Sequence, residues 1–98
     1  MEVPSTMADY AGLVSRLRGF ADEGHAPAEV MGWLHDELRL LGSGRVSSFT
    51  FTHCLTQAFG MDFEIAQRVR TWVRLGWGGS MSDGELNELL AGRLETRN

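Results

Sequence analysis

The 98-residue chain contains one cysteine, Cys54, no lysine, and no apolar run long enough to cross a membrane. Small secreted domains usually carry paired cysteines, so the single thiol excludes an internal disulfide framework and favours a cytoplasmic protein. A spanning helix needs about 20 apolar residues, far more than any stretch here provides. Residues 1–5 have neither the basic nor the apolar segment of a signal peptide. We therefore expect a cytoplasmic protein that does not enter a membrane.

Signatures of catalysis, metal binding and cofactor binding are also missing. The histidines His25, His35 and His53 lack the close ligand spacing of a zinc site. His53 and Cys54 are adjacent, but neighbouring helical residues point about 100° apart, so this pair is not arranged as base and nucleophile. The glycine-rich segment 76–80 lacks the Lys-Ser/Thr ending of a phosphate-binding loop. We predict no catalytic residue, no metal and no cofactor, and hence that the protein is not an enzyme.

All nine basic residues are arginines, against 13 acidic residues, which gives a formal charge of −4. Residues 1–44 carry seven acids and three arginines, residues 45–78 two acids and four arginines, and residues 79–98 four acids and two arginines. A protein that coats nucleic acid needs a positive binding face, which the acidic ends of the chain argue against. Nucleic acid is therefore not the expected partner, although the basic middle segment keeps DNA binding open as an alternative.

The chain is instead rich in glycines that separate apolar stretches with helical spacing. Gly24, Gly42, Gly60 and Gly76 each follow such a stretch, and each precedes another helical stretch. Glycine readily adopts the left-handed conformation that satisfies the last carbonyls of a helix, so these residues mark helix ends. The pattern predicts an all-α fold, a compact bundle of four or five short helices. Residues 1–98 are expected to form a single helical domain.

The first two helices are predicted over about residues 6–22 and from Pro27 to Gly42. Ser5 or Thr6 can cap the first, and proline is well placed in the first turn of the second because its missing N–H costs nothing there. The short connection predicts antiparallel neighbours. The expected inner stripes are Tyr10, Leu13, Val14, Leu17, Phe20 and Ala21 in the first helix, and Val30, Met31, Leu34, Leu38 and Leu41 in the second.

Residues 46–52 alternate β-branched, polar and aromatic side chains, and two interpretations compete for them. The alternation is typical of a strand. We prefer a helix capped by Ser47 or Ser48, since no partner strand is apparent and the helical spacing continues to Gly60. The apolar residues that carry this spacing are Phe51, Cys54, Leu55, Ala58 and Phe59.

Two further helices are predicted after Gly60. Asp62 is a suitable N-cap for a helix that ends near Gly76, and Ser82 with Glu85 has the spacing of a capping box for the last helix. The fourth helix should bury Phe63, Ala66, Val69 and Val73 with Ile65 and Trp72 flanking, and the last should bury Leu86, Leu89, Leu90 and Leu94.

A second stripe on the second helix marks a candidate binding surface. Trp33 lies about 120° from the centre of the inner face, on the same side as Leu40. Either another helix covers this tryptophan, or it anchors a partner, as tryptophan often does at binding hot spots. Glu29, Asp36 and Glu37 surround it, and an acidic rim favours a basic partner. These five residues are the predicted partner-binding site.

The alternative function is DNA binding by the pair of helices joined at residues 60–62. The short turn and the positive second helix are typical of a helix-turn-helix. Gln67, Arg68, Thr71 and Arg74 would then face DNA, while Glu64 at the start of that helix would oppose phosphate.

The stretch from Leu55 to Ala66, with the sequence LTQAFGMDFEIA, resembles a helix-turn-helix-like element of small bacterial proteins. Similar segments occur in the C-terminal domain of the ribosomal stalk protein and in immunity proteins of polymorphic toxin systems. The chain has neither the strands nor the lysine-rich surface of the stalk domain, so no role in translation is implied. The resemblance implies a packing element and suggests an immunity-type inhibitor, which binds a bacterial toxin, expected to be basic, and neutralises it.

Overall fold

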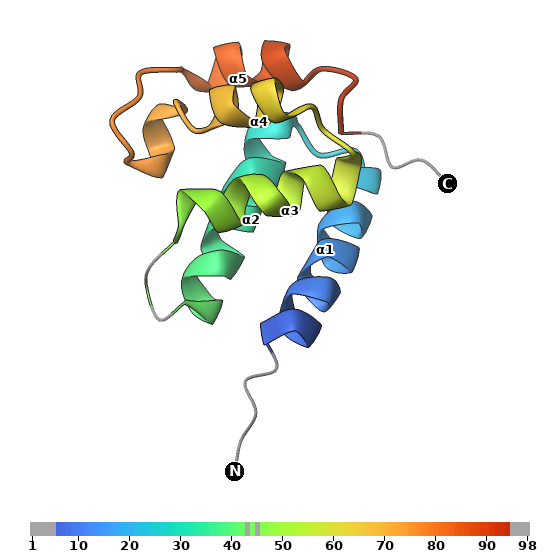
Figure 1. Ribbon diagram of the computed structural model, residues 1–98. Coiled ribbons are helices and arrows are strands. Elements are labelled where there is room, and N and C mark those ends of the chain that lie inside the picture. The colour runs from blue at the N-terminus through green and yellow to red at the C-terminus, as the bar shows by residue number, and fades with distance from the viewer. Residues whose placement is uncertain (1–5, 43, 45, 95–98) are drawn as a thin grey trace.

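The computed structural model describes residues 6–42, 44 and 46–94, with side chains from residue 12 onward. This part of the chain is all-α and contains no strand, only one isolated bridge between Trp72 and Met81. None of its helices is both long and apolar enough to span a bilayer. The elements in order are α1 (Thr6–Asp22), α2 (Pro27–Leu41), α3 (Ser48–Phe59), α4 (Phe63–Val69), the 3-10 helix η1 (Val73–Leu75) and α5 (Asp83–Leu90) (Figure 1).

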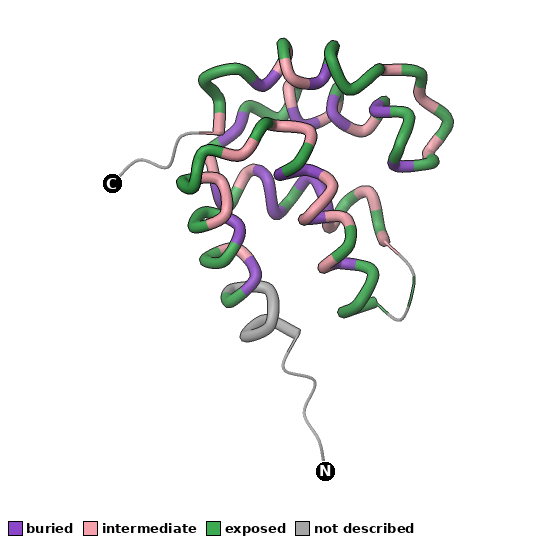
Figure 2. The backbone as a smooth tube through the Cα atoms, turned by 180° about the vertical axis from the view of Figure 1, so that it is seen from behind, coloured by how far each residue is buried: buried purple, intermediate pink, exposed green. Residues whose placement is uncertain are grey.

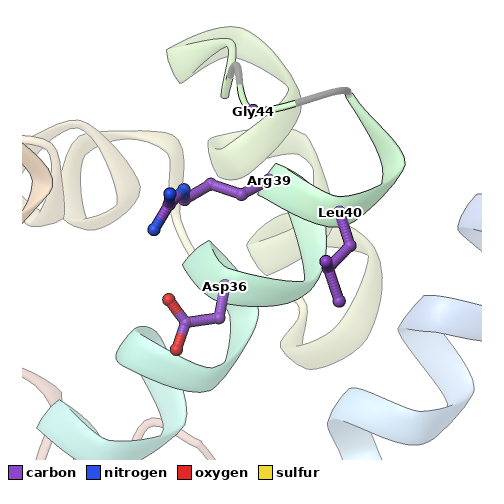
Figure 3. Close-up of a pocket in the computed structure, with 4 residues that line it drawn as sticks. All are labelled: Asp36, Arg39, Leu40 and Gly44. Atoms are coloured by element: carbon purple, nitrogen blue, oxygen red, sulfur yellow. The ribbon is translucent and has the colours of Figure 1, made fainter.

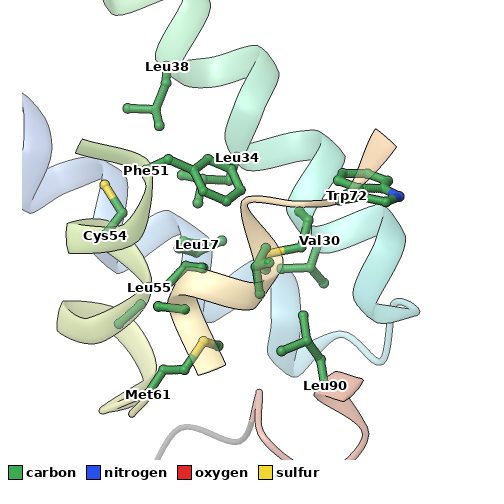
Figure 4. Packing of buried hydrophobic residues seen from close by; sticks show 14 of the residues in the cluster. Leu17, Val30, Leu34, Leu38, Phe51, Cys54, Leu55, Met61, Trp72 and Leu90 are labelled. Atoms are coloured by element: carbon green, nitrogen blue, oxygen red, sulfur yellow. The ribbon is translucent and has the colours of Figure 1, made fainter. Parts of the chain in front are cut away.

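The helices pack around one hydrophobic core to which every helix contributes. α1 packs against α2 and α3, while α4 packs on α3 and α5 packs on α2. Figure 1 shows α4 and α5 at the same end of the molecule. Buried residues recur along the inner sides of the helices (Figure 2). Figure 4 shows the side chains that meet in the centre, among them Leu17, Leu34, Leu55, Trp72 and Leu90.

The predicted helix ends are confirmed at several positions. α1 ends at Asp22, and the αL residue Gly60 ends α3 with its N–H donating to the carbonyl of Thr56. The capping box of α5 is present, since Ser82 accepts from the Glu85 N–H and Glu85 accepts from the Ser82 N–H. The predicted cap Ser5 lies outside the described residues, and so do the side chains of Thr6 and Tyr10.

The preferred helix over residues 46–52 is confirmed, and no strand forms there. α3 begins at Ser48, so Val46 and Ser47 lie just before it. Ser47 is the N-cap of α3, and its hydroxyl accepts a hydrogen bond from the Thr50 N–H at 3.4 Å. Phe51, Cys54 and Leu55 then point into the core. The apparent β pattern is a helical one, because the residues with helical spacing are the buried ones.

Two caps come from side chains far away in sequence and hold the bundle together. Arg18 on α1 donates to the carbonyls of Ala58 at 3.0 Å and Gln57 at 3.1 Å, at the C-terminal end of α3. Asn87 on α5 accepts from the Ala28 N–H at 2.8 Å, in the first turn of α2. Helix ends expose unsatisfied carbonyl and N–H groups, so these contacts stabilise both the ends and the packing of the helices.

The region after α4 differs from the prediction. α4 ends at Val69, and the chain turns before η1 instead of remaining helical to Gly76. Trp72, predicted to flank the inner face, is 1% exposed, whereas Phe63 and Val73, predicted to be buried, are 66% and 52% exposed. The turn reorients the chain so that the indole of Trp72 is buried. The free energy gained by burying so large an apolar group exceeds what the hydrogen bonds of a longer α4 would contribute.

Smaller corrections concern the ends of α2 and α5. Leu41, predicted on the inner stripe of α2, is 40% exposed. Gly42 does end the helix, but with φ −101°, outside the left-handed region. Leu94 lies beyond the end of α5 and is half-buried. These positions belong to final turns, where packing rather than helical spacing decides which side chain is covered.

Residues 71–81 form a loop closed by two backbone hydrogen bonds. The Met81 N–H donates to the Thr71 carbonyl, and the Val73 N–H donates to the Met81 carbonyl, each at 2.9 Å. A Cβ added at Gly79 would lie 2.0 Å from the Thr71 oxygen and 2.3 Å from the Thr71 carbonyl carbon. Only glycine fits this close approach of two backbone segments.

Gly79→Ala is therefore expected to lower the free energy of unfolding by about 1–3 kcal/mol, as overpacking does. The matched control is Gly84→Ala, because a Cβ at Gly84 has only the Ser82 hydroxyl, 4.0 Å away, as a neighbour. Urea unfolding of both variants measures the difference. Equal stability of Gly79→Ala and the wild type would show that the loop does not make this approach.

Candidate functional site

Trp33 on α2 packs against α1. Its ring stacks on Phe20 with centroids 5.2 Å apart, and the guanidinium carbon of Arg16 lies 5.7 Å from its centroid. The side chain is half-buried and borders the core. Of the two alternatives for this tryptophan, the structure supports coverage by another helix, because a residue of α1 stacks on its ring.

The stack on Trp33 continues towards the turn between α1 and α2. The ring of His25 stacks on Phe20 with a centroid distance of 3.9 Å. Its Nε2 atom lies 3.1 Å from Glu23, and its Nδ1 atom lies 3.5 Å from Glu29. Glu29 also accepts the Ala26 N–H at 3.1 Å, so it serves the start of α2.

Glu37 on α2 also contacts α1. Its carboxylate is half-buried and accepts a hydrogen bond from Arg16 at 3.0 Å. We call the set of Arg16, Phe20, His25, Trp33 and Glu37 the α1–α2 seam. It holds the two helices against each other through the aromatic stack and the Arg16–Glu37 ion pair.

Asp36 and Leu40 lie beside this seam, on the solvent side of α2. Leu40 is 77% exposed, and Asp36 is exposed as well. Together with Arg39 and Gly44 they line a surface hollow of about 530 Å³, which we call the α2 hollow. Figure 3 shows Asp36 and Arg39 extending from the same side of α2 and Leu40 from another side.

The five predicted partner-binding residues thus fall into two groups. Glu29, Trp33 and Glu37 are engaged with residues of α1 or of the turn before α2, whereas Asp36 and Leu40 remain open to a partner. Prediction from sequence missed Arg16 and Arg39. Helical spacing could have placed Arg39 beside Asp36, but no local pattern indicates which residue of α1 meets Trp33.

The residues expected to face DNA do not share one helix. Gln67 and Arg68 belong to α4, Thr71 lies in the turn after it, and Arg74 lies in η1. The guanidinium of Arg74 is 3.4 Å from the carboxylate of Asp83 and 5.6 Å from the ring centroid of Trp72. No single helical face therefore presents these four side chains to a groove.

Cys54 is buried, as predicted from its place on the apolar stripe. Burial raises the pKa of this thiol to about 11, because the apolar surroundings penalise the charged thiolate. The thiolate is the reactive form of cysteine, so this side chain is a poor nucleophile at neutral pH. Its role is that of a small hydrophobic core residue.

His35 packs under the loop that carries Trp77. Its ring lies 6.1 Å from Trp77 and 6.5 Å from Phe51, in edge-on arrangements. Desolvation lowers the pKa of His35, Arg39 lowers it further, and Asp36 opposes the shift. The folded protein therefore favours the neutral form of the His35 ring.

Acidification is expected to destabilise the protein through His35. Because its pKa in the folded protein lies below the ordinary histidine value of 6.5, the unfolded chain binds the proton more tightly, and stability is lost as pH falls below 6.5. Urea unfolding at about pH 7.5 and about pH 5.5 measures this loss. His35→Gln should show a smaller decrease than the wild type, and an identical decrease would rule out this contribution of His35.

Comparisons with known proteins leave the family open. No protein-family model matches the chain, and neither the curated proteins nor the solved structures contain a significant match. The resemblance of residues 55–66 to immunity proteins therefore stays a prediction, and the function is argued from the geometry of α2.

Proposed function

We propose that this protein is a protein-binding domain of the immunity type, which neutralises a bacterial toxin by covering its active site with α2. The observation that supports this most is the exposure of Leu40. A leucine with 77% of its surface in water, on a well-formed helix beside a hollow, is available for burial by a partner. Burying such a side chain contributes about 1.5–3 kcal/mol to an interface.

Charge supports a basic partner. Asp36 lies one turn before Leu40 and, with Arg39, lines the same hollow, while residues 1–44 as a whole carry seven acids and three arginines, a charge of −4. Complementary charge raises the rate of association and suppresses wrong partners. Toxins that act on nucleic acids present basic clefts, which an acidic helix complements.

Rigidity of the surface also supports the proposal. Trp33 stacks on Phe20, and Arg16 bonds Glu37, so α2 is held against α1 before any partner arrives. A surface ordered in advance loses less conformational entropy on binding. Trp33 thus acts by positioning α2, and Leu40 rather than Trp33 becomes the anchor that we propose for the partner.

Growth rescue tests this function. The product of the gene immediately upstream is expressed in a bacterial host, alone or together with the wild-type protein or with a variant. We expect the wild type to restore growth and Leu40→Asp to lose most of this protection, because the variant places a charge where the partner should bury an apolar group.

Phe49→Asp is the matched control, since Phe49 is 76% exposed but belongs to α3 and not to the α2 hollow. It should protect as the wild type does. Equal protection by Leu40→Asp, or a growth defect that the wild type does not relieve, would contradict the proposal.

A further inference from the structure

Among the residues that the structure describes, the α2 hollow is lined by one acidic and one basic side chain, Asp36 and Arg39, and neither is used within the protein. Asp36 and Arg39 are both exposed, and neither forms an ion pair with any residue that the structure describes. They are three positions apart on α2 and extend from the same side of the helix (Figure 3). Leu40 extends from another side of α2 (Figure 3), and helical spacing puts Arg39 and Leu40 at the two edges of an arc of about 100° that contains Asp36.

Such a patch is complementary to itself. In a two-fold dimer each subunit offers the same surface, so residue i of one copy meets residue j of the other, and j meets i. If two α2 helices cross in antiparallel fashion, Asp36 of each copy faces Arg39 of the other. The exposed Leu40 of each copy then enters the hollow of its neighbour, whose volume of about 530 Å³ accommodates it.

We infer that the α2 hollow binds a second copy of this chain, as a two-fold dimer formed by Asp36, Arg39 and Leu40. The charges select this occupant, because a wholly acidic face would repel its own copy, whereas a face with one acid and one base does not. The neighbouring Glu37 does not disturb the pairing, since Arg16 of its own chain already neutralises it.

The expected association is weak. A single helix crossing with one leucine on each side buries less than the roughly 800 Å² per subunit of a standard stable interface. We therefore expect a monomer at about 1 µM and a substantial dimer fraction only towards about 1 mM. Self-association also covers Asp36 and Leu40, so the dimer would hide the anchor that a toxin needs. This last consequence rests on the proposed function, but the dimer itself does not.

Sedimentation equilibrium of the purified full chain tests the inference without any partner protein. Asp36→Arg places arginine against Arg39 of the other copy, and Arg39→Asp places two acids together, so each should weaken dimerisation by about tenfold or more. The double variant Asp36→Arg/Arg39→Asp restores opposite charges and should recover dimerisation. All these positions are exposed, and circular dichroism verifies the fold of each variant.

The matched control uses α4, where Glu64 and Arg68 also line a hollow beside the exposed Phe63. Glu64→Arg should leave dimerisation unchanged. A protein that stays monomeric up to about 1 mM, a dimer that both single reversals leave intact, or one that only Glu64→Arg weakens would each overturn the inference. Failure of the double variant to recover would do the same. The growth assay is read independently, so the loss of one proposal is distinguishable from the loss of the other.

Discussion

Leu34→Ala is expected to lower the free energy of unfolding by about 2–5 kcal/mol. Leu34 lies on α2 and has no exposed surface. Its truncation removes apolar contacts and leaves a cavity that the surrounding helices fill only in part. Denaturant unfolding followed by circular dichroism measures the change.

The matched control for Leu34 is on the same helix. Leu40→Ala makes the same chemical change at a side chain that is 77% exposed, so its effect should remain within about 0.5 kcal/mol. If Leu40→Ala destabilised the protein as much as Leu34→Ala, the assignment of inner and outer faces to α2 would be wrong.

Trp72→Ala should destabilise the protein by about 3–5 kcal/mol, as truncations of buried tryptophan do. The side chain is 1% exposed, and its indole N–H donates to the Asp83 carboxylate at 2.8 Å. It thereby connects the segment after α4 to the first turn of α5. Thermal and urea unfolding of the variant test this expectation.

Trp72→Phe separates the ring from its hydrogen bond. It keeps an aromatic core group but loses the donor to Asp83, so we expect a loss of stability smaller than that of Trp72→Ala. A Trp72→Ala variant with nearly wild-type stability would mean that the chain after Val69 is not anchored in the core.

Helix ends were the part of the fold that the sequence indicated best. The glycine after α3 and the Ser82–Glu85 capping box act through hydrogen bonds to residues only a few positions away, so their effect is visible locally. The early end of α4 was not visible in this way. It depends on the burial of Trp72 among residues of α2 and α5, and helical spacing alone continued through Trp72 to Gly76.

At the candidate site, too, local spacing predicted some features, while contacts between helices decided the others. Helical spacing correctly put Trp33 and Leu40 on a stripe apart from the inner face of α2. It could not tell that α1 covers Trp33 and leaves Leu40 exposed, because this depends on contacts between the two helices, such as the stack of Phe20 on Trp33, that no local pattern indicates. The anchor of the proposed interface therefore changed from the tryptophan to the leucine.

The central claim, that α2 carries the partner-binding surface, is tested most directly by nuclear magnetic resonance. The isotope-labelled protein is titrated with the product of the gene immediately upstream, and backbone amide shifts are followed residue by residue. The account predicts that the largest perturbations fall on residues 36–41 of α2, with little change over residues 63–74. Perturbations centred on residues 63–74, with residues 36–41 unaffected, would contradict it.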